Sequence, residues 1–147
     1  MAATRPFASA DDLLAAADRV WTAADPTDWL EAFAAHPKIG AGQAGRAERP
    51  EGTEEAEWAA QEQSGARVAP DDVRERLARG NRDYEARFGY IFIVCATGKS
   101  ADEMLAALEH RLRNAPDVEI GIAADEQRRI TRLRLLKLLS DERKAHT

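Results

Sequence analysis

One apolar stretch of the sequence decides between an all-helical and a mixed fold: Tyr90-Ile91-Phe92-Ile93-Val94-Cys95-Ala96. By pattern alone, such a run could form a buried β-strand. A strand needs a neighbour for its backbone hydrogen bonds, and the rest of the chain offers no strand to pair with it. We therefore expect a buried extended or helical segment, and an all-α fold built as a single-domain multi-helix bundle.

Helix signals flank this stretch on both sides. Ser9, Asp25 and Ser100 are candidate N-caps, and Glu103 completes a capping-box pattern with Ser100. These signals predict helices that begin after Ser9 and Asp25, and a further helix over 101–113. We also expect helices from about Thr53 to Gln63, over 71–87 with Asp71 as cap, and over 117–142. The apolar faces of the first, second and last helices are expected to bury Leu13, Leu14, Ala17, Val20, Trp21, Trp29, Leu30, Phe33, Ile130, Leu133, Leu136 and Leu139.

Composition limits the classes of protein to consider. The chain has 147 residues, 30 of them Ala, which fits one domain over residues 1–147. A net charge of −5 disfavours nucleic-acid binding, and no apolar run approaches the length of a membrane span. A single cysteine excludes an internal disulfide, and three widely spaced histidines argue against a metal centre. We expect a soluble, cytoplasmic protein.

His36 is the first candidate for chemistry. It precedes Pro37, which restricts the backbone, at the predicted end of the second helix. An imidazole held there suits proton transfer near neutral pH. The alternative is a histidine that favours the helix dipole. Residues 37–53 follow as a long, glycine-rich loop, a functional or mobile segment.

Two further residues have both a functional and a structural interpretation. Glu62 lies four residues after Trp58, hence on the same helix face, where a nearby indole can raise a carboxyl pKa. The simpler alternative is a solvated helix carboxylate. Arg87 precedes a Gly turn and an apolar wall, a suitable place for a carboxylate clamp, but an arginine there can also meet helix carbonyls. The basic residues of the last helix, such as Arg128, are expected on a solvated face.

Taken together, these motifs resemble those of the 2-oxo-4-hydroxy-4-carboxy-5-ureidoimidazoline (OHCU) decarboxylase family. The resemblance spans nearly the whole chain. The residues that carry it are Arg5-Pro6-Phe7, His36-Pro37-Lys38-Ile39-Gly40, Trp58 with Glu62-Gln63, the stretch from Asn81 to Ala96, and the region from Glu109 to Leu139 with Arg111-Leu112 and Glu119.

The resemblance implies an all-α homodimer that converts OHCU to (S)-allantoin and CO₂ without a metal or organic cofactor. It makes His36 the catalytic histidine and Glu62 its acidic partner. The substrate-binding residues would be Pro37, Ala59, Gln63, Arg87, Tyr90, Ile91, Phe92, Ile93 and Val94. Ala59 stands where the family commonly has serine, so one substrate hydrogen bond would be lost or supplied by water. Tyr90-Ile91 also stands where Phe-Pro is frequent.

Two other functions remain open from the sequence. A non-catalytic helical interaction module would explain the Ala-rich helices and the basic last helix. It would not explain why the His-Pro, Glu-Gln and Arg-Phe-Gly motifs occur together. A related enzyme acting on another ureido or imidazoline acid is the second alternative, and Ala59 is the residue that points to it.

Overall fold

The protein is helical throughout the described residues, which are 5–37 and 71–145 of a computed structural model, and this part contains no β-strand. The all-α prediction is confirmed. The helices are α1 (Ala10–Ala23), α2 (Pro26–Ala34), α5 (Asp71–Phe88), α6 (Ala101–Arg111) and α7 (Pro116–Ala145).

Three helices begin at the predicted caps. The Ser9 hydroxyl accepts a hydrogen bond from the Asp12 N–H at 3.1 Å. Asp25 accepts from two N–H groups at the start of α2 and forms a complete capping box. Ser100 accepts from the Glu103 N–H at 3.2 Å. Each cap satisfies helix N–H groups that have no partner within the helix, which explains why α1, α2 and α6 start where they do.

Helix ends differ from the predictions by a few residues. The helix predicted over 101–113 ends at Arg111, and the last helix runs over Pro116–Ala145 rather than 117–142. Pro116 fits the first helical turn because that position needs no N–H donor. Asp71 is the first residue of α5 rather than its cap.

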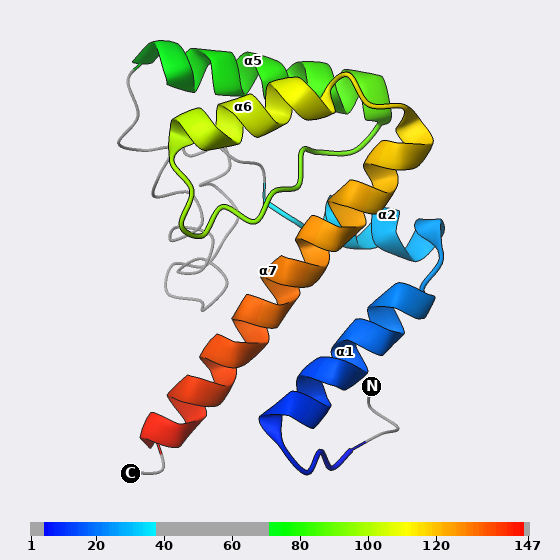
Figure 1. Ribbon diagram of the computed structural model, residues 1–147, viewed down its shortest axis with the longest axis vertical. Helices are drawn as coiled ribbons and strands as arrows, with labels where there is room; N and C mark the ends of the chain where they lie inside the picture. Colours follow the sequence, from blue (N-terminus) through cyan, green and yellow to red (C-terminus); the bar gives the residue numbers. More distant parts are fainter. Residues whose placement is uncertain (1–4, 38–70, 146–147) are drawn as a thin grey trace.

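Two groups of helices make up the described fold (Figure 1). Helices α5 and α6 lie side by side and run in the same direction, so the chain between them must return along their length. Helix α7 crosses from this pair towards α1, which runs beside it. With 30 residues, α7 is about 45 Å long. None of the described helices is long and apolar enough to cross a membrane.

Indole hydrogen bonds join α1, α2 and α7. The Trp21 Nε1–H on α1 donates to the Ala124 carbonyl of α7 at 2.8 Å. The Trp29 Nε1–H on α2 donates to the Trp21 carbonyl at 3.1 Å, and the two indole rings lie 6.1 Å apart. These bonds satisfy both indole donors where the rings are only partly exposed.

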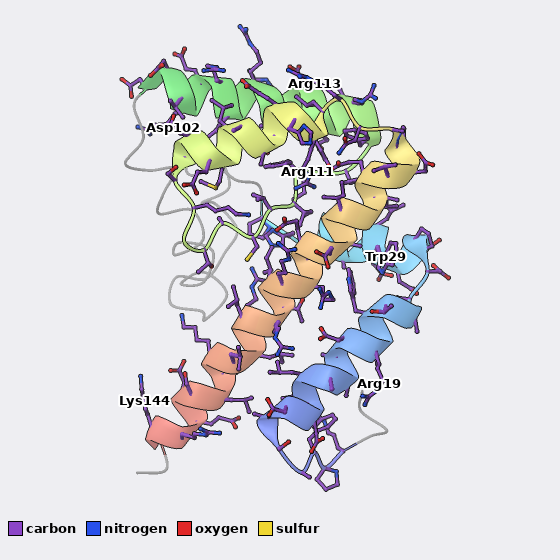
Figure 2. The ribbon with its side chains drawn as sticks, viewed as in Figure 1. Arg19, Trp29, Asp102, Arg111, Arg113 and Lys144 are labelled. Carbon is purple, nitrogen blue, oxygen red and sulfur yellow. The ribbon has the colours of Figure 1, made fainter. Side chains whose placement is uncertain are left out.

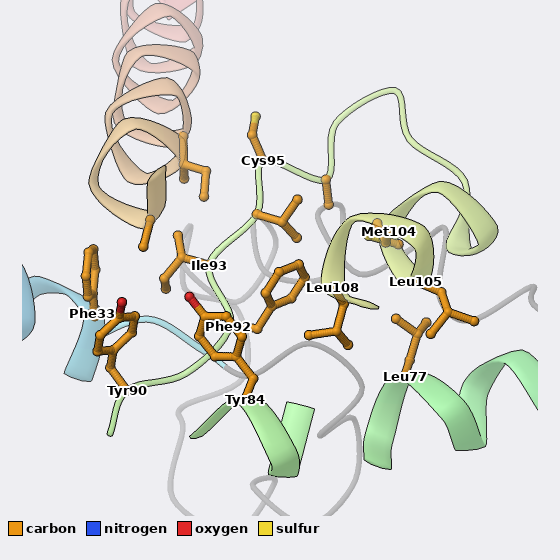
Figure 3. Packing of buried hydrophobic residues seen from close by; sticks show 14 of the residues in the cluster. Phe33, Leu77, Tyr84, Tyr90, Phe92, Ile93, Cys95, Met104, Leu105 and Leu108 are labelled. Atoms are coloured by element: carbon orange, nitrogen blue, oxygen red, sulfur yellow. The ribbon is translucent and has the colours of Figure 1, made fainter. Parts of the chain in front are cut away.

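The core lies where α5, α6 and α7 meet the chain between α5 and α6 (Figure 3). Its largest fully buried side chains are Tyr84, Phe33, Phe92, Ile93, Met104, Leu108 and Glu119. The predicted core residues Leu14, Phe33 and Ile130 are buried as expected.

Several other predicted core residues are exposed. Val20 is 50% exposed, Leu30 41%, Leu133 41% and Leu136 42%. Their predicted burial is wrong for the described chain. Helical periodicity identifies an apolar face but not whether another element covers it. The second half of α7 packs against α1 on one side, so part of its leucine face stays open.

Candidate active site

The segment that follows α5 is a buried irregular chain. Gly89 at its start has φ +83°, a left-handed conformation that glycine adopts without strain and that ends α5. From Tyr90 to Ala96 every residue is buried except Ile91, which is partly exposed. The sequence predicted that this segment is buried and left open whether it is extended or helical. The structure confirms the burial and excludes the helix.

Charged side chains from two helices fix this segment. Arg111 of α6 donates from Nη1 to the Ile93 carbonyl at 2.6 Å. The Cys95 N–H donates to Glu126 Oε2 of α7 at 2.8 Å. Within the described residues, the backbone of Tyr90 to Val94 forms one hydrogen bond, the one from Arg111. Most of its polar groups therefore do not bond to the described helices.

Arg111, whose position is labelled in Figure 2, belongs to a buried network between α5, α6 and α7. Its Nε and Nη2 atoms each lie 2.6 Å from Oε1 of Glu119, which is fully buried. The same oxygen accepts from the Tyr84 hydroxyl at 2.5 Å, and Oε2 accepts from Asn114 Nδ2 at 2.9 Å. Each of these groups thus has a charged or polar partner, which buried ionic groups require.

The two tyrosines of the chain both have a raised pKa. Burial raises the pKa of Tyr84 well above its usual value of 10, and its hydrogen bond to Glu119 raises it further. Burial also raises the pKa of Tyr90, whose ring centroid lies 5.8 Å from that of Tyr84. Both phenols therefore keep their proton over the whole neutral range, and Tyr84 donates a hydrogen bond to Glu119.

His36 lies directly after α2 and close in sequence to a residue that contacts the segment. Its N–H donates to the Phe33 carbonyl at 3.1 Å, and the Phe33 ring lies 5.2 Å from the Tyr90 ring. Nδ1 of His36 lies 3.1 Å from the Pro37 carbonyl, and Nε2 is buried. If Nδ1 carries the proton, Nε2 is the basic nitrogen. His36 and Pro37 therefore lie within four residues of a side chain that packs against the predicted substrate-binding segment.

Three predicted site residues lie outside the described part of the chain: Ala59, Glu62 and Gln63. The predicted loop beyond Pro37 and the predicted helix from Thr53 lie outside it as well. Their roles stay predictions from the sequence.

Arg87 forms a hydrogen bond and a ring contact at the protein surface. Its Nη2 donates to the Asn114 carbonyl at 2.9 Å, and its guanidinium lies 5.1 Å from the centroid of the Phe88 ring. This resembles the structural alternative, an arginine that meets backbone carbonyls, although the carbonyl belongs to the turn before α7. A role as carboxylate clamp stays a prediction.

The basic face of α7 is ion-paired in its middle. Arg128 donates to Asp125 at 2.8 Å, and this hydrogen bond lowers the pKa of Asp125. Arg132 lies 3.4 Å from Asp18 of α1, in an ion pair that joins the two helices. The expected solvated face is therefore partly an interhelical contact. Asp18, Arg128 and Arg132 line a pocket between α1 and α7, and none of the predicted site residues lines it.

Sequence reasoning underestimated the Arg111–Glu119 pair. No burial was predicted for Glu119 from the sequence, but it is 0% exposed. Helical spacing carried a signal for both residues. Arg111 continues the buried positions Met104 and Leu108 of α6, and Glu119 begins the buried series of α7 that includes Ala123. A charged residue in register with an apolar face indicates a buried partner.

Within the described residues, no group of three or more His, Cys, Asp or Glu side chains is arranged to hold a metal ion. The polar groups near the segment are instead a histidine, two phenols, backbone amides and one buried ion pair. Such groups can bind, orient and protonate a small polar substrate.

Comparison with known proteins relates the chain to one family. The family profile described as OHCU decarboxylase matches residues 1–136. The chain is 40% identical over 148 residues to the uric acid degradation bifunctional protein TTL of Arabidopsis thaliana, an alignment that covers 98% of this chain and 44% of that protein. It is 33% identical over 141 residues to the 2-oxo-4-hydroxy-4-carboxy-5-ureidoimidazoline decarboxylase of Haloferax volcanii, covering 95% of this chain and 78% of the relative.

A solved structure extends the similarity to the fold. The structure, described as OHCU decarboxylase in the presence of (S)-allantoin, superposes with a TM-score of 0.76 at 38% sequence identity. The superposition covers 94% of this chain and 87% of that one. The chain therefore shares both sequence and architecture with this family, although it spans less than half the length of the Arabidopsis relative.

Proposed function

The chain belongs to the OHCU decarboxylase family, and from that premise we propose that it removes CO₂ from OHCU to give (S)-allantoin. The observation that carries this proposal is the family match over residues 1–136. The position of His36 supports it, because Phe33, three residues earlier, packs against Tyr90 of the buried segment.

The substrate is suited to decarboxylation by side chains alone. Its carboxylate sits on a carbon next to a C=N group, so the electrons left by CO₂ can flow into that imine. The substrate thereby supplies the electron sink that many decarboxylases obtain from a cofactor. The protein must hold the carboxylate in the reactive orientation, polarise the ring and deliver a proton to one face.

We assign the catalytic roles to His36 and Glu62. His36 handles the hydroxyl or carboxylate proton and protonates carbon after CO₂ leaves. Glu62 orients His36 or the ureido group. Both roles follow the family pattern, and the buried Nε2 of His36 is a suitable proton carrier.

Binding is assigned to the groups around this pair. Pro37, Gln63 and residues 90–94 contact the substrate, the last largely through backbone groups, and Arg87 is a further candidate for its carboxylate. Ala59 takes the place of the common serine. Loss of that hydrogen bond would weaken binding by about 0.5–1.5 kcal/mol if no water replaces it.

A circular dichroism assay tests the proposal. OHCU is generated from urate with urate oxidase and hydroxyisourate hydrolase, and this protein is then added. We expect fast appearance of optically active allantoin. A trace identical to the slow spontaneous decay, which yields racemic allantoin, would refute the proposal and favour a non-catalytic module or an enzyme for another ureido acid.

Two variants test the catalytic assignment. His36→Gln and Glu62→Ala should each lower kcat by about 10²–10⁴-fold, the usual contribution of a general acid or base. His110→Gln and Glu75→Ala are matched controls, because both residues are exposed on other helices and should leave kcat unchanged. Near-normal turnover by either site variant, at unchanged far-UV circular dichroism, would contradict the assignment.

We further propose that the chain forms one decarboxylase domain that assembles as a homodimer. The exposed Leu133 and Leu136 of α7 support this, since exposed leucines on one helix favour a protein partner. Light scattering should give a molar mass of twice 16.2 kDa. The double variant Leu133→Glu/Leu136→Glu should halve it, and a wild-type mass of one chain would refute the dimer. A cytoplasmic location stays a prediction from composition.

A further inference from the structure

We propose that Arg111 is the positioning residue for the substrate-binding backbone of residues 90–94. This inference rests on the proposed function, which places that backbone against OHCU. The segment is neither helix nor strand, so regular hydrogen bonding does not determine its path. A side chain that fixes its path therefore also determines where the backbone groups meet the substrate.

Arg111 holds the segment at two adjacent residues. Its Nη1 donates to the Ile93 carbonyl at 2.6 Å, and its guanidinium carbon lies 4.6 Å from the centroid of the Phe92 ring. The hydrogen bond fixes the orientation of one peptide, and the cation–π contact fixes the side chain before it. Because the arginine side chain is only 6% exposed, water competes little with either interaction.

Arg111 is itself immobilised by three helices. Glu119 of α7 accepts from its Nε at 2.6 Å, and Tyr84 of α5 and Asn114 hold the carboxylate in turn. The guanidinium thus connects the body of the protein to the segment. Arginine suits this task because its planar donors can meet a carboxylate and a carbonyl together. A lysine ammonium is a point charge without that geometry.

The alternative is that Arg111 and Glu119 only stabilise the fold. Removing one partner of a buried ion pair leaves the other charge buried without compensation. Replacing both partners by apolar side chains of similar volume is often tolerated. A purely structural pair is therefore replaceable by an apolar pair without change in substrate binding. A positioning arginine cannot be replaced without such a change, because the apolar pair lacks the hydrogen-bond donor to the Ile93 carbonyl.

The decisive variant is Arg111→Met/Glu119→Leu. We expect a folded protein with native far-UV circular dichroism and a KM for OHCU raised about tenfold or more, as for loss of a charged hydrogen bond. Unfolding alone would lower the apparent kcat through the fraction of folded protein and leave KM unchanged. Arg76→Met/Glu109→Leu is the matched control, since this exposed pair is likewise an ion pair between two helices, α5 and α6, and should leave KM unchanged.

Two further measurements keep the inference testable. Arg111→Lys retains the charge opposite Glu119 and should also raise KM. It therefore tests the inference even if the double variant fails to fold. Amide exchange in residues 91–95 should be faster in the site variants than in the control pair. Wild-type KM and wild-type exchange in a folded Arg111 variant would overturn the inference. Absence of OHCU turnover by the wild type would instead refute the proposed function, and the exchange measurement would still report on Arg111.

Discussion

Replacement of Gly80 by alanine should destabilise the protein although alanine is the better helix former. Gly80 lies within α5 and is buried against α6. A Cβ atom at this position would lie 2.5 Å from Cδ2 and 3.1 Å from Cγ of Leu108. Leu108 is 0% exposed, so the residues packed around it must accommodate any movement of its side chain. The methyl group must therefore push the two helices apart or strain Leu108.

Two opposing terms set the expected magnitude. Glycine to alanine in a helix interior gains about 1 kcal/mol from helix propensity. Overpacking of a filled core costs about 1–3 kcal/mol. The difference is a net loss of up to about 2 kcal/mol, which corresponds to a Tm lower by about 3 °C for each kcal/mol in a chain of this size.

The assay is urea and thermal unfolding followed by circular dichroism at 222 nm. Gly121→Ala is the matched control, because Gly121 is an exposed residue of α7 and a Cβ atom there would meet nothing within 4 Å. This control should gain about 0.4–1 kcal/mol. The same chemical change thus has opposite signs at the two sites.

A double-mutant cycle tests the cause. Leu108→Ala alone should cost about 2–5 kcal/mol, since it leaves a cavity. In the Gly80→Ala background the new methyl group occupies part of that space, so the double variant should be at least about 1 kcal/mol more stable than additivity predicts. Equal stabilisation by Gly80→Ala and Gly121→Ala, or an additive cycle, would refute the packing argument.

Two further predictions concern buried polar groups. Tyr84 and Tyr90 both have raised pKa values, so their protonated state stabilises the fold below pH 10 and this contribution is lost at higher pH. Absorbance at 295 nm should show phenolate formation only together with alkaline loss of the circular dichroism signal; reversible ionisation near pH 10 in a folded protein would contradict this. Trp21→Phe removes the donor to the Ala124 carbonyl and should cost about 0.5–1.5 kcal/mol in urea unfolding, whereas unchanged stability would show that water replaces the bond.

Local signals in the sequence predicted the helix starts well. Ser9, Asp25 and Ser100 each hydrogen-bond an N–H group two or three residues away, so the residues that determine the structure are adjacent in the chain. Helix ends were less predictable, as at Arg111, because the last turns fray and their length depends on the elements that pack against them.

The candidate site likewise combines residues that a local motif predicted with residues that it did not. His36 and Pro37 were predicted as site residues from their motif, and Phe33, a few residues earlier in the chain, packs against the buried segment. The His-Pro motif carried no information on the Arg111–Glu119 pair. Those residues are eight positions apart on two helices, and the turn between α6 and α7 is what places them 2.6 Å apart.

The sequence by itself determined the helical class, the three helix caps, the burial of residues 90–96 and the family resemblance. These properties depend on residue type, on contacts between neighbours in the chain or on motif order. Only the tertiary structure decided that Leu133 and Leu136 stay exposed and that Arg111 holds the Ile93 carbonyl. Burial and hydrogen bonding between distant segments depend on which surfaces meet. Helical periodicity specifies only which surfaces are apolar enough to be buried.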